Sequence, residues 1–179
     1  MALSATVFHL TVELADIDRG VYETLDLHVA REPSETAEYM LMRVLAYALE
    51  YRPGIAFTGG VASGDEPAVL VRDDTGRITA WIEVGLPDAG RLHRGRKLAG
   101  RAAVYTHRNV SQVLAHLSGA GVHMASDIPI YALPREVIAE IATAIQRRST
   151  VSLSITEREL YVEVEGRTWS TPIVEHRVA

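Results

Sequence analysis

The segment 64–97 constrains the fold more than any other part of the chain. It reads GDEPAVLVRDDTGRITAWIEVGLPDAGRLHRGRK. Two runs with the composition of β-strands, 69–71 and 78–84, flank the turn-forming residues 73–76, and this order predicts an antiparallel hairpin. A helical pattern with four basic residues comes next, at Arg91, Arg94, Arg96 and Lys97. The segment therefore predicts a strand–turn–strand–helix unit.

One carboxylate, Glu83, lies within the second of these strand-like runs. Side chains alternate between the two faces of a strand. Thr79, Trp81 and Glu83 are therefore expected on one face, and the other face is apolar, with Ile78, Ala80, Ile82 and Val84. A carboxylate near a strand end is most often solvated, but a charge beside a tryptophan in a β-rich run is less expected to face water. Glu83 is the first candidate for a functional carboxylate.

The acidic pair before the hairpin gives this carboxylate expected neighbours. A four-residue turn at 73–76 would place Glu66 directly across from Glu83, and a shift by one residue would place Asp65 there. Cross-strand neighbours have Cβ atoms about 4.5–5.5 Å apart. Converging carboxylate oxygens can hold a hard cation with several waters still bound. This pairing predicts a site for Mg²⁺ or Mn²⁺.

The remainder of the chain alternates between β and helical patterns. Residues 3–14 and 21–29 predict an N-terminal hairpin, and the alternation from 150 onward predicts another at the C-terminus. Strands and helices alternate between them. The expected fold class is α/β, an α+β roll with one mixed β-sheet, packed helices and a β-hairpin at each end. No linker is long enough to split the chain, so 1–179 is expected to form a single domain.

The most regular helical pattern runs from Pro33-Ser34 to Leu49. Ser34 is the expected N-cap, and Glu35 is expected in the first turn as a surface anion favoured by the helix dipole. Glu38 lies closer to the apolar stripe and can lean over the edge of the core. Glu38 is therefore a second candidate for a functional carboxylate.

Composition excludes several classes of chemistry. The chain has no cysteine, and none of its seven histidines has helical or cysteine-paired zinc spacing. The glycine-rich segment 58–64 lacks the Gly-Lys-Ser/Thr end of a P-loop. No Gly-x-Ser-x-Gly elbow indicates a serine hydrolase.

Charge and hydropathy limit the expected partners. The net charge of −5 does not favour nucleic-acid binding by bulk electrostatics. The only concentrated basic region is 91–101, with four arginines and one lysine. It is either a phosphate-facing patch or a solvated helix face. No secretory signal and no apolar stretch of roughly 20 residues is present, so a cytoplasmic protein with no membrane partner is expected.

Four motifs together resemble the YaeQ family of bacterial proteins. They are Met-Ala-Leu-x-Ala-Thr at the N-terminus, Pro-Ser-Glu-Thr at 33–36 followed by Glu38, Gly-Asp-Glu-Pro at 64–67, and Trp-Ile-Glu-Val-Gly-Leu-Pro-Asp at 81–88. The resemblance extends from residue 1 to about residue 175. It implies a variant of the PD-(D/E)XK nuclease fold, with a restriction-endonuclease-like core between the terminal hairpins.

The resemblance also implies roles for individual acids. Glu38, with Glu35 near it, would be the acid of the first helix. Asp65, with Glu66 beside it, would be the acid at the start of the second core strand, and Glu83 the acid of the third. The implied Mg²⁺ ligands are therefore Glu38, Asp65, Glu66 and Glu83.

One position departs from the motif of that fold. The motif lysine, two residues after the third acid, is Gly85 here. Arg94 or Lys97 from the following helix could reach back and replace it. Lysine can lose its proton when buried and arginine effectively cannot, so Arg94 would stabilise charge and not act as a base.

Two functions are consistent with these residues. The first is a Mg²⁺-dependent phosphodiesterase acting on nucleic acid, against which the net charge and the missing lysine count. The second is a binding or regulatory module that kept the scaffold and lost hydrolysis, because a fold does not determine a function.

Overall fold

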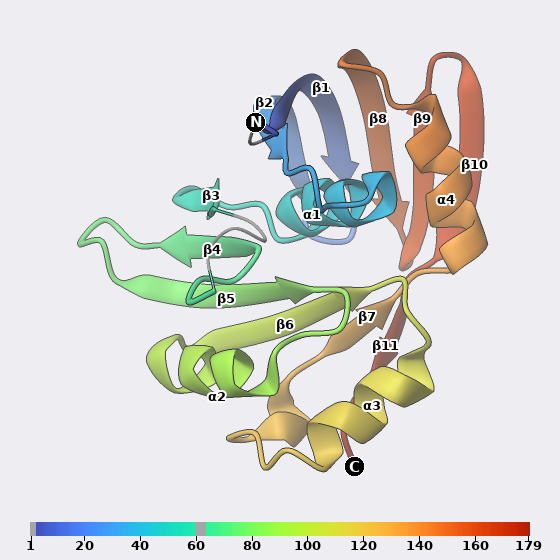
Figure 1. Ribbon diagram of the computed structural model, residues 1–179. Coiled ribbons are helices and arrows are strands. Elements are labelled where there is room, and N and C mark those ends of the chain that lie inside the picture. The colour runs from blue at the N-terminus through green and yellow to red at the C-terminus, as the bar shows by residue number, and fades with distance from the viewer. Residues whose placement is uncertain (1–2, 60–63) are drawn as a thin grey trace.

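The computed structural model describes residues 3–59 and 64–179. In this part of the chain, two β-sheets and four α-helices form the fold (Figure 1). Both sheets contain parallel and antiparallel strand pairs, which confirms the expected mixed α+β class. The expectation of one mixed sheet was wrong, because the strands divide between two.

The first sheet contains strands from both ends of the chain. They are β1 (Thr6–Asp16), β2 (Val21–Arg31), β8 (Arg148–Thr156), β9 (Glu159–Val164) and β10 (Arg167–Pro172), in the order β10-β9-β8-β1-β2. The two expected terminal hairpins are confirmed as β1–β2 and β8–β9. Parallel pairing of β1 with β8 joins them into one sheet. Such non-local pairing has no sequence signal in either hairpin.

The second sheet contains the central strands and one strand from the C-terminus. They are β3 (Ile55–Phe57), β4 (Val69–Arg72), β5 (Ile78–Val84), β6 (Arg101–Thr106), β7 (Ile130–Ala132) and β11 (Val174–His176), in the order β11-β7-β6-β5-β4-β3. Strands β5, β6 and β7 are parallel. Their carboxyl ends therefore lie at the same edge of the sheet.

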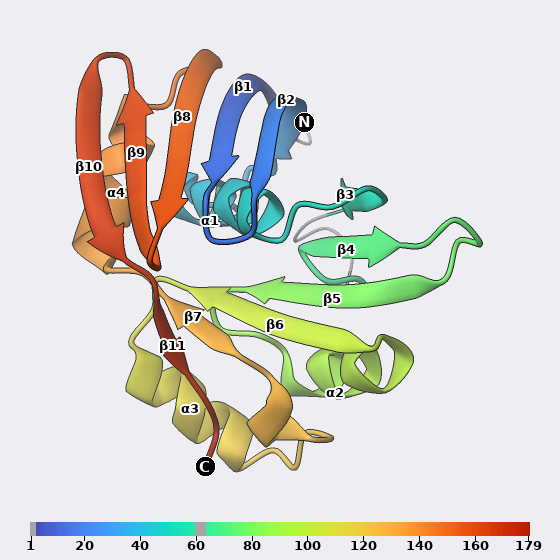
Figure 2. The same ribbon diagram turned by 180° about the vertical axis from the view of Figure 1, so that it is seen from behind.

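Helix α1 (Ala37–Leu49) lies between the two sheets (Figures 1 and 2). Its apolar face shares one core with both sheets: Leu41 and Leu45 are buried there with Val12 of β1 and Ile82 of β5. Helix α4 (Arg135–Ala144) contacts α1 and β10. The periodicity that predicted α1 reflects this burial, because nine of its thirteen residues are buried.

A second core lies on the opposite face of the second sheet. Helices α2 (Ala89–Leu98) and α3 (Val110–Ser118) cover that face, and a 3-10 helix (Ala125–Asp127) follows α3. Trp81, Leu92 and Val113 belong to this core, whereas Ala80 and Val84 belong to the first. The alternation expected along the second strand of the hairpin is therefore confirmed at its centre. No helix in the described part of the chain is long and apolar enough to cross a membrane.

Helix α1 begins later than expected. Thr36, not Ser34, is the N-cap, and its Oγ1 accepts a hydrogen bond from the Tyr39 N–H at 3.1 Å. Glu35 therefore precedes the helix, and it is not the expected surface anion. It is 3% exposed and forms a buried ion pair with Arg43, with 2.6 Å between Nη2 and Oε1. Ser34 and Thr36 can both cap a helix. The helix begins after Thr36, two residues later than expected.

The register of the central hairpin also differs from the expectation. Val69 pairs with Ile82, and residues 64–67 lie outside β4, so neither Glu66 nor Asp65 pairs with Glu83. A β-bulge after Val71 shifts the pairing. The Asp73 carboxylate holds the longer turn by accepting hydrogen bonds from the backbone N–H groups of residues 75 and 77.

Candidate active site at the carboxyl edge of the second sheet

The parallel strands of the second sheet define the candidate site. We call the place where β5, β6 and β7 end the carboxyl edge. The Gly85 N–H donates to the Tyr105 carbonyl at 2.9 Å, which holds the end of β5 beside β6. In open α/β sheets, ligands bind outside the carboxyl ends of parallel strands. The first turn of α1, with Glu38 and Tyr39, lies at the same edge, because both residues interact electrostatically with groups there.

Glu83 lies at the end of β5 and is fully buried, with 0% of its surface exposed. The single N–H at Arg91 Nε is shared between the two carboxylate oxygens of Glu83, with Nε at 2.7 Å from Oε1 and 3.0 Å from Oε2. Burial raises the pKa of Glu83, and the hydrogen bonds and charge of Arg91 oppose that rise. The centre of the candidate site is therefore a buried carboxylate paired with one arginine.

Arg91 reaches Glu83 because of where α2 begins. The Asp88 side chain caps the helix by accepting from the Arg91 N–H at 2.7 Å. Helical side chains point back toward the N-terminus, so Arg91, in the first turn, extends toward the end of β5. Its Nη1 also donates to the Gly64 carbonyl at 3.4 Å. Arg91 thus links Glu83 to the acidic loop at 64–66.

Close packing holds α2 against β5. A Cβ atom at Gly95 would lie 2.2 Å from the Cδ2 atom of Trp81, so only glycine permits this contact. The indole ring therefore occupies the helix surface at Gly95. This contact sets the distance between α2 and β5. The Arg91 side chain can reach Glu83 because α2 lies this close to the strand.

The position two residues after Glu83 does not suit a lysine. Gly85 has a φ of +79°, and a Cβ atom there would lie 3.3 Å from the Tyr39 ring. A lysine would need both a left-handed backbone and space that Tyr39 occupies. Burial raises the pKa of Tyr39, and the nearby charge of Glu83 raises it further. The cation beside the acid comes instead from α2.

The structure does not gather the predicted ligands around one point. Asp65 has a 99% exposed side chain, with its Oδ1 at 3.8 Å from Arg94 Nη2, and Glu66 is exposed. Glu38 is half-buried and its charge acts on His107. Only Glu83 is buried. Among the described residues, a group of three possible metal ligands within 4.8 Å occurs elsewhere, and none of these four carboxylates is in it.

The predicted cations lie further from Glu83 than Arg91 does. Arg94 contacts Asp65, and Lys97 is exposed without a hydrogen-bond or ion-pair partner among the described residues. At about 1.5 Å of rise per residue, they are roughly 4.5 and 9 Å further along the helix than Arg91. The residue that sequence reasoning missed is therefore Arg91. Asp88 was the available signal, because an N-cap there puts Arg91 in the first turn.

The basic residues of the segment 91–101 have different partners. Arg101 belongs to β6 and forms a two-pronged ion pair with the buried Glu50, with its Nη2 at 2.7 Å from Oε1. Arg96 approaches Asp127 at 3.9 Å. Arg94 and Lys97 face solvent. The exposed basic surface is therefore smaller than the sequence suggests.

His107 follows the end of β6 and adds another perturbed group to the edge. Its Nδ1 atom is buried without a hydrogen-bond partner among the described residues. Burial lowers the pKa of His107, the positive charge of Arg108 lowers it further, and Glu38 acts in the opposite direction. His107 is therefore held in its neutral form more strongly than a solvated histidine.

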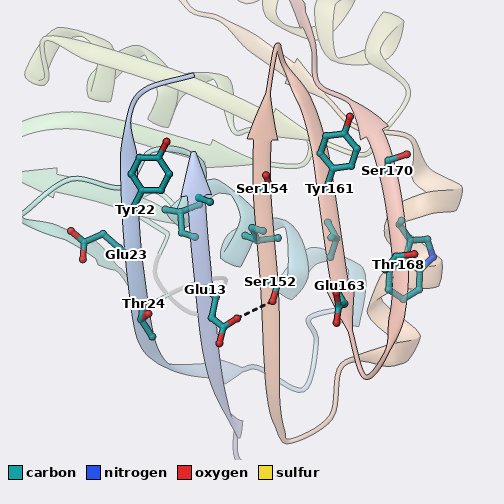
Figure 3. Close-up of a pocket in the computed structure, with 15 residues that line it drawn as sticks. Glu13, Tyr22, Glu23, Thr24, Ser152, Ser154, Tyr161, Glu163, Thr168 and Ser170 are labelled. Atoms are coloured by element: carbon teal, nitrogen blue, oxygen red, sulfur yellow. Dashed lines mark hydrogen bonds between the residues drawn. The ribbon is translucent and has the colours of Figure 1, made fainter. Parts of the chain in front are cut away.

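A hollow elsewhere on the molecule competes as a site. It lies on the outer face of the first sheet, has a volume of about 850 Å³, and is lined by Glu13, Tyr22, Ser152, Tyr161 and Glu163 among others (Figure 3). Ser152 donates to Glu13 across it at 3.1 Å. The perturbed titratable groups mark the carboxyl edge as the better candidate for chemistry.

The fold and the edge define an α+β protein of two mixed sheets, with a buried acid–arginine pair where parallel strands end. The chain belongs to the YaeQ family: the family model described as YaeQ protein matches residues 1–173. It is 30% identical to the protein from Escherichia coli K12 described as "Uncharacterized protein YaeQ", covering 96% of this chain and 99% of that one. The Salmonella typhi protein of the same description is 28% identical, with the same coverage.

Solved structures agree with this assignment. The crystal structure of YaeQ protein from Pseudomonas syringae matches with a TM-score of 0.87 and 29% identity, covering 98% of this chain and 96% of that one. The structure of YaeQ protein from Xanthomonas axonopodis pv. citri matches with a TM-score of 0.85 and 26% identity, covering 97% and 98%. The family resemblance seen in the sequence motifs is confirmed.

Proposed function

We propose that the chain is a Mg²⁺- or Mn²⁺-dependent phosphodiesterase acting on nucleic acid, with a PD-(D/E)XK-like site at the carboxyl edge. The observation that carries this proposal is the placement of Glu83. A fully buried carboxylate ends a parallel strand, beside an acidic loop and under a helix that supplies arginine. Burying an ion pair is weak evidence for a stabilising role, because desolvation offsets the attraction. A functional role accounts better for its position.

The electrostatics of the edge support the proposal. The pKa values of Glu83 and Tyr39 are raised and that of His107 is lowered, all at the carboxyl ends of β5 and β6. Perturbed titratable groups cluster at functional sites, although structural ion pairs also perturb pKa values. Three such groups at one edge favour the functional interpretation.

The candidate donors near the edge are all oxygens, but they are not gathered around one point. Glu83 is buried, whereas Asp65 and Glu66 are exposed on the loop whose Gly64 carbonyl contacts Arg91, so this loop must move toward Glu83 to share an ion with it. Mg²⁺ prefers such oxygens and keeps several waters. When bound, the ion would polarise the scissile phosphate and lower the pKa of an attacking water. Glu83 and Asp65 would hold it, with Glu66 and Glu38 as outer acids.

In this proposal Arg91 has two positions. Without a metal ion it neutralises Glu83, because both carboxylate oxygens accept from its Nε atom. Its side chain is 20% exposed, so it can turn toward solvent when a cation takes over that charge. There it would stabilise negative charge on the phosphate. Arginine cannot act as the base, so the attacking water must lose its proton to another group.

The exposed cations of α2 supply the contact with nucleic acid. Arg94 and Lys97 face solvent on the same helix as Arg91. Phosphate contacts of this kind give affinity that falls with salt, independently of sequence. The net charge of −5 limits binding to this local surface.

Metal-dependent cleavage tests the proposal. Plasmid DNA, single-stranded DNA and RNA are incubated with the protein and Mn²⁺ or Mg²⁺, comparing the wild type, Glu83→Gln and the control Asp74→Asn. Asp74 is an exposed acid of the hairpin turn. We expect cleavage by the wild type and the control and none by Glu83→Gln. No cleavage of any substrate by the wild type would contradict the hydrolytic function.

A second function is favoured by one specific observation. Arg91 satisfies both oxygens of Glu83, as expected of a scaffold that has replaced its metal by a fixed ion pair. In that case this protein is a binding module that binds nucleic acid without hydrolysing it. Binding would persist in EDTA and weaken in Arg94→Ala and Lys97→Ala but not in Arg52→Ala, an exposed arginine elsewhere. Loss of binding in EDTA would favour the phosphodiesterase instead.

A further inference from the structure

Three side chains on the outer face of the first sheet have the arrangement of a transition-metal site. His9, Asp26 and His28 each bring one ligand atom within 4.8 Å of the other two. The histidines have no zinc spacing along the sequence. This group has no such signal, because His9 is distant in sequence from Asp26 and His28 and meets them only through strand pairing.

The β1–β2 register fixes the backbone of this group. His9 pairs directly with His28, and Thr11 pairs with Asp26. Residues that pair across a ladder project to the same face, and so do residues two apart on one strand. His9, Asp26 and His28 therefore project from the same face of the sheet. All three lie within paired strands and none lies in a loop. A metal ion would find its ligands already positioned on a rigid element.

The side chains of this group contact one another directly. His9 Nε2 forms a hydrogen bond with Asp26 Oδ1. The rings of His9 and His28 stack, with 4.4 Å between centroids and an interplanar angle of 21°.

We propose that His9, Asp26 and His28 bind a divalent transition-metal ion of the Zn²⁺ class through two imidazoles and one carboxylate. Imidazole suits Zn²⁺, Cu²⁺, Ni²⁺ and Fe²⁺, whereas Mg²⁺ and Ca²⁺ take oxygen ligands. The site is therefore chemically distinct from the all-oxygen donors around Glu83. It stands independently of the proposed phosphodiesterase function.

The surroundings indicate what completes the coordination. Three protein ligands leave at least one position open, as in sites that bind water or a substrate. Arg148 on β8 pairs with His9 on the other side, and both line a hollow of about 530 Å³ with Glu13, Glu163 and Glu165. His9 is the member of the group that lines this hollow. Arg148 attracts an anion there and the three glutamates repel it, so water is the ligand expected at the open position.

Zinc titration of the untagged protein tests the site directly. The protein is treated with EDTA, dialysed and titrated with ZnCl₂ by calorimetry, and its Co²⁺ complex is followed by visible absorption. We expect one ion per chain. Loss of even an outer partner of a metal ligand weakens binding about 10–100-fold, so His28→Gln and His9→Gln are expected to lose about 100-fold or more, and Asp26→Asn about tenfold or more.

Two matched variants make the test specific. His176→Gln removes a histidine from the second sheet, and His123→Gln removes an exposed histidine that follows α3. Both are expected to bind Zn²⁺ like the wild type. Because His28 is exposed on the edge strand β2, His28→Gln is expected to fold normally, which its urea midpoint checks. Absence of Zn²⁺ and Co²⁺ binding, or equal binding by His28→Gln and the wild type, would overturn the proposal.

Discussion

Glu83 of β5 and Arg91 of α2 form an ion pair in which the acid is fully buried and the arginine side chain is 20% exposed. Removing the arginine would leave a buried carboxylate without its cation. We expect Arg91→Ala to lower the free energy of unfolding by about 2–4 kcal/mol at neutral pH and to raise the pKa of Glu83 further. Urea unfolding measures the change, with Arg52→Ala as the surface control.

A double-mutant cycle separates this pair from other effects. With Glu83→Gln present, Arg91→Ala is expected to be less damaging, giving a coupling energy of about 1–3 kcal/mol. Additive effects within about 0.5 kcal/mol would show that the two residues do not stabilise each other.

Two glycines of α2 give opposite predictions for the same substitution. Gly95→Ala places a methyl group 2.2 Å from the Trp81 ring. We expect it to destabilise the protein by about 1–3 kcal/mol despite the better helix propensity of alanine. Gly90→Ala meets its nearest atom, Asp88 Oδ1, at 3.4 Å and is expected to be neutral or slightly stabilising.

Thermal unfolding compares the two glycine variants. Equal midpoints for Gly95→Ala and Gly90→Ala would contradict the close contact between α2 and the indole. Displacement of α2 also moves Arg91, so Gly95→Ala is expected to disturb the site as well as the fold.

The extent to which this site could be predicted differs between residues. Glu83 was identified correctly as an unusual buried acid, because strand alternation is a local property. The register of Asp65 and Glu66 was wrong, because a bulge after Val71 intervenes. Arg91 was overlooked in favour of Arg94 and Lys97, since the reach of a helical side chain depends on where the helix starts.

Long-range contacts explain most of the remaining differences in the fold. Both terminal hairpins were predicted, but their union through β1 and β8 was not, because the pairing residues are far apart in the sequence. The same reason applies to two buried acids. Glu35 pairs with Arg43, and Glu50 pairs with Arg101, although neither acid has a sequence signal for burial.

The network around Glu50 gives a prediction for stability. The Tyr105 hydroxyl donates to Glu50 Oε1 at 2.8 Å, and Arg101 holds both carboxylate oxygens. Tyr105→Phe is expected to cost about 1–2 kcal/mol, because it removes one hydrogen bond to a charged group. Glu50→Ala is expected to cost about 3 kcal/mol or more, since it leaves Arg101 without its partner. Urea unfolding with Tyr22→Phe as the exposed control checks both values.

The lowered pKa of His107 predicts how the free energy of unfolding depends on pH. Its pKa in the folded protein is below the unfolded value of 6.5, because burial and Arg108 disfavour the charged form. As pH falls below about 6.5, the unfolded chain takes up this proton before the folded protein does. Its contribution to stability is therefore present above that pH and is lost as pH falls toward the folded pKa.

Unfolding measured between about pH 5 and pH 8 tests this prediction. His107→Gln is expected to show a flatter decline on the acid side than the wild type. His123→Gln, which removes an exposed histidine, is expected to follow the wild type. Identical slopes for His107→Gln and the wild type would show that His107 does not titrate differently in the folded state.

Anomalous scattering from a crystal soaked in Mn²⁺ tests for a metal ion at Glu83 without relying on activity. We expect a peak beside the Glu83 carboxylate, with the Asp65 side chain moved toward it and the Arg91 side chain turned away from Glu83. That peak should vanish in Glu83→Gln crystals. The absence of any peak at the carboxyl edge, with Arg91 still on Glu83, would contradict a metal-dependent site there.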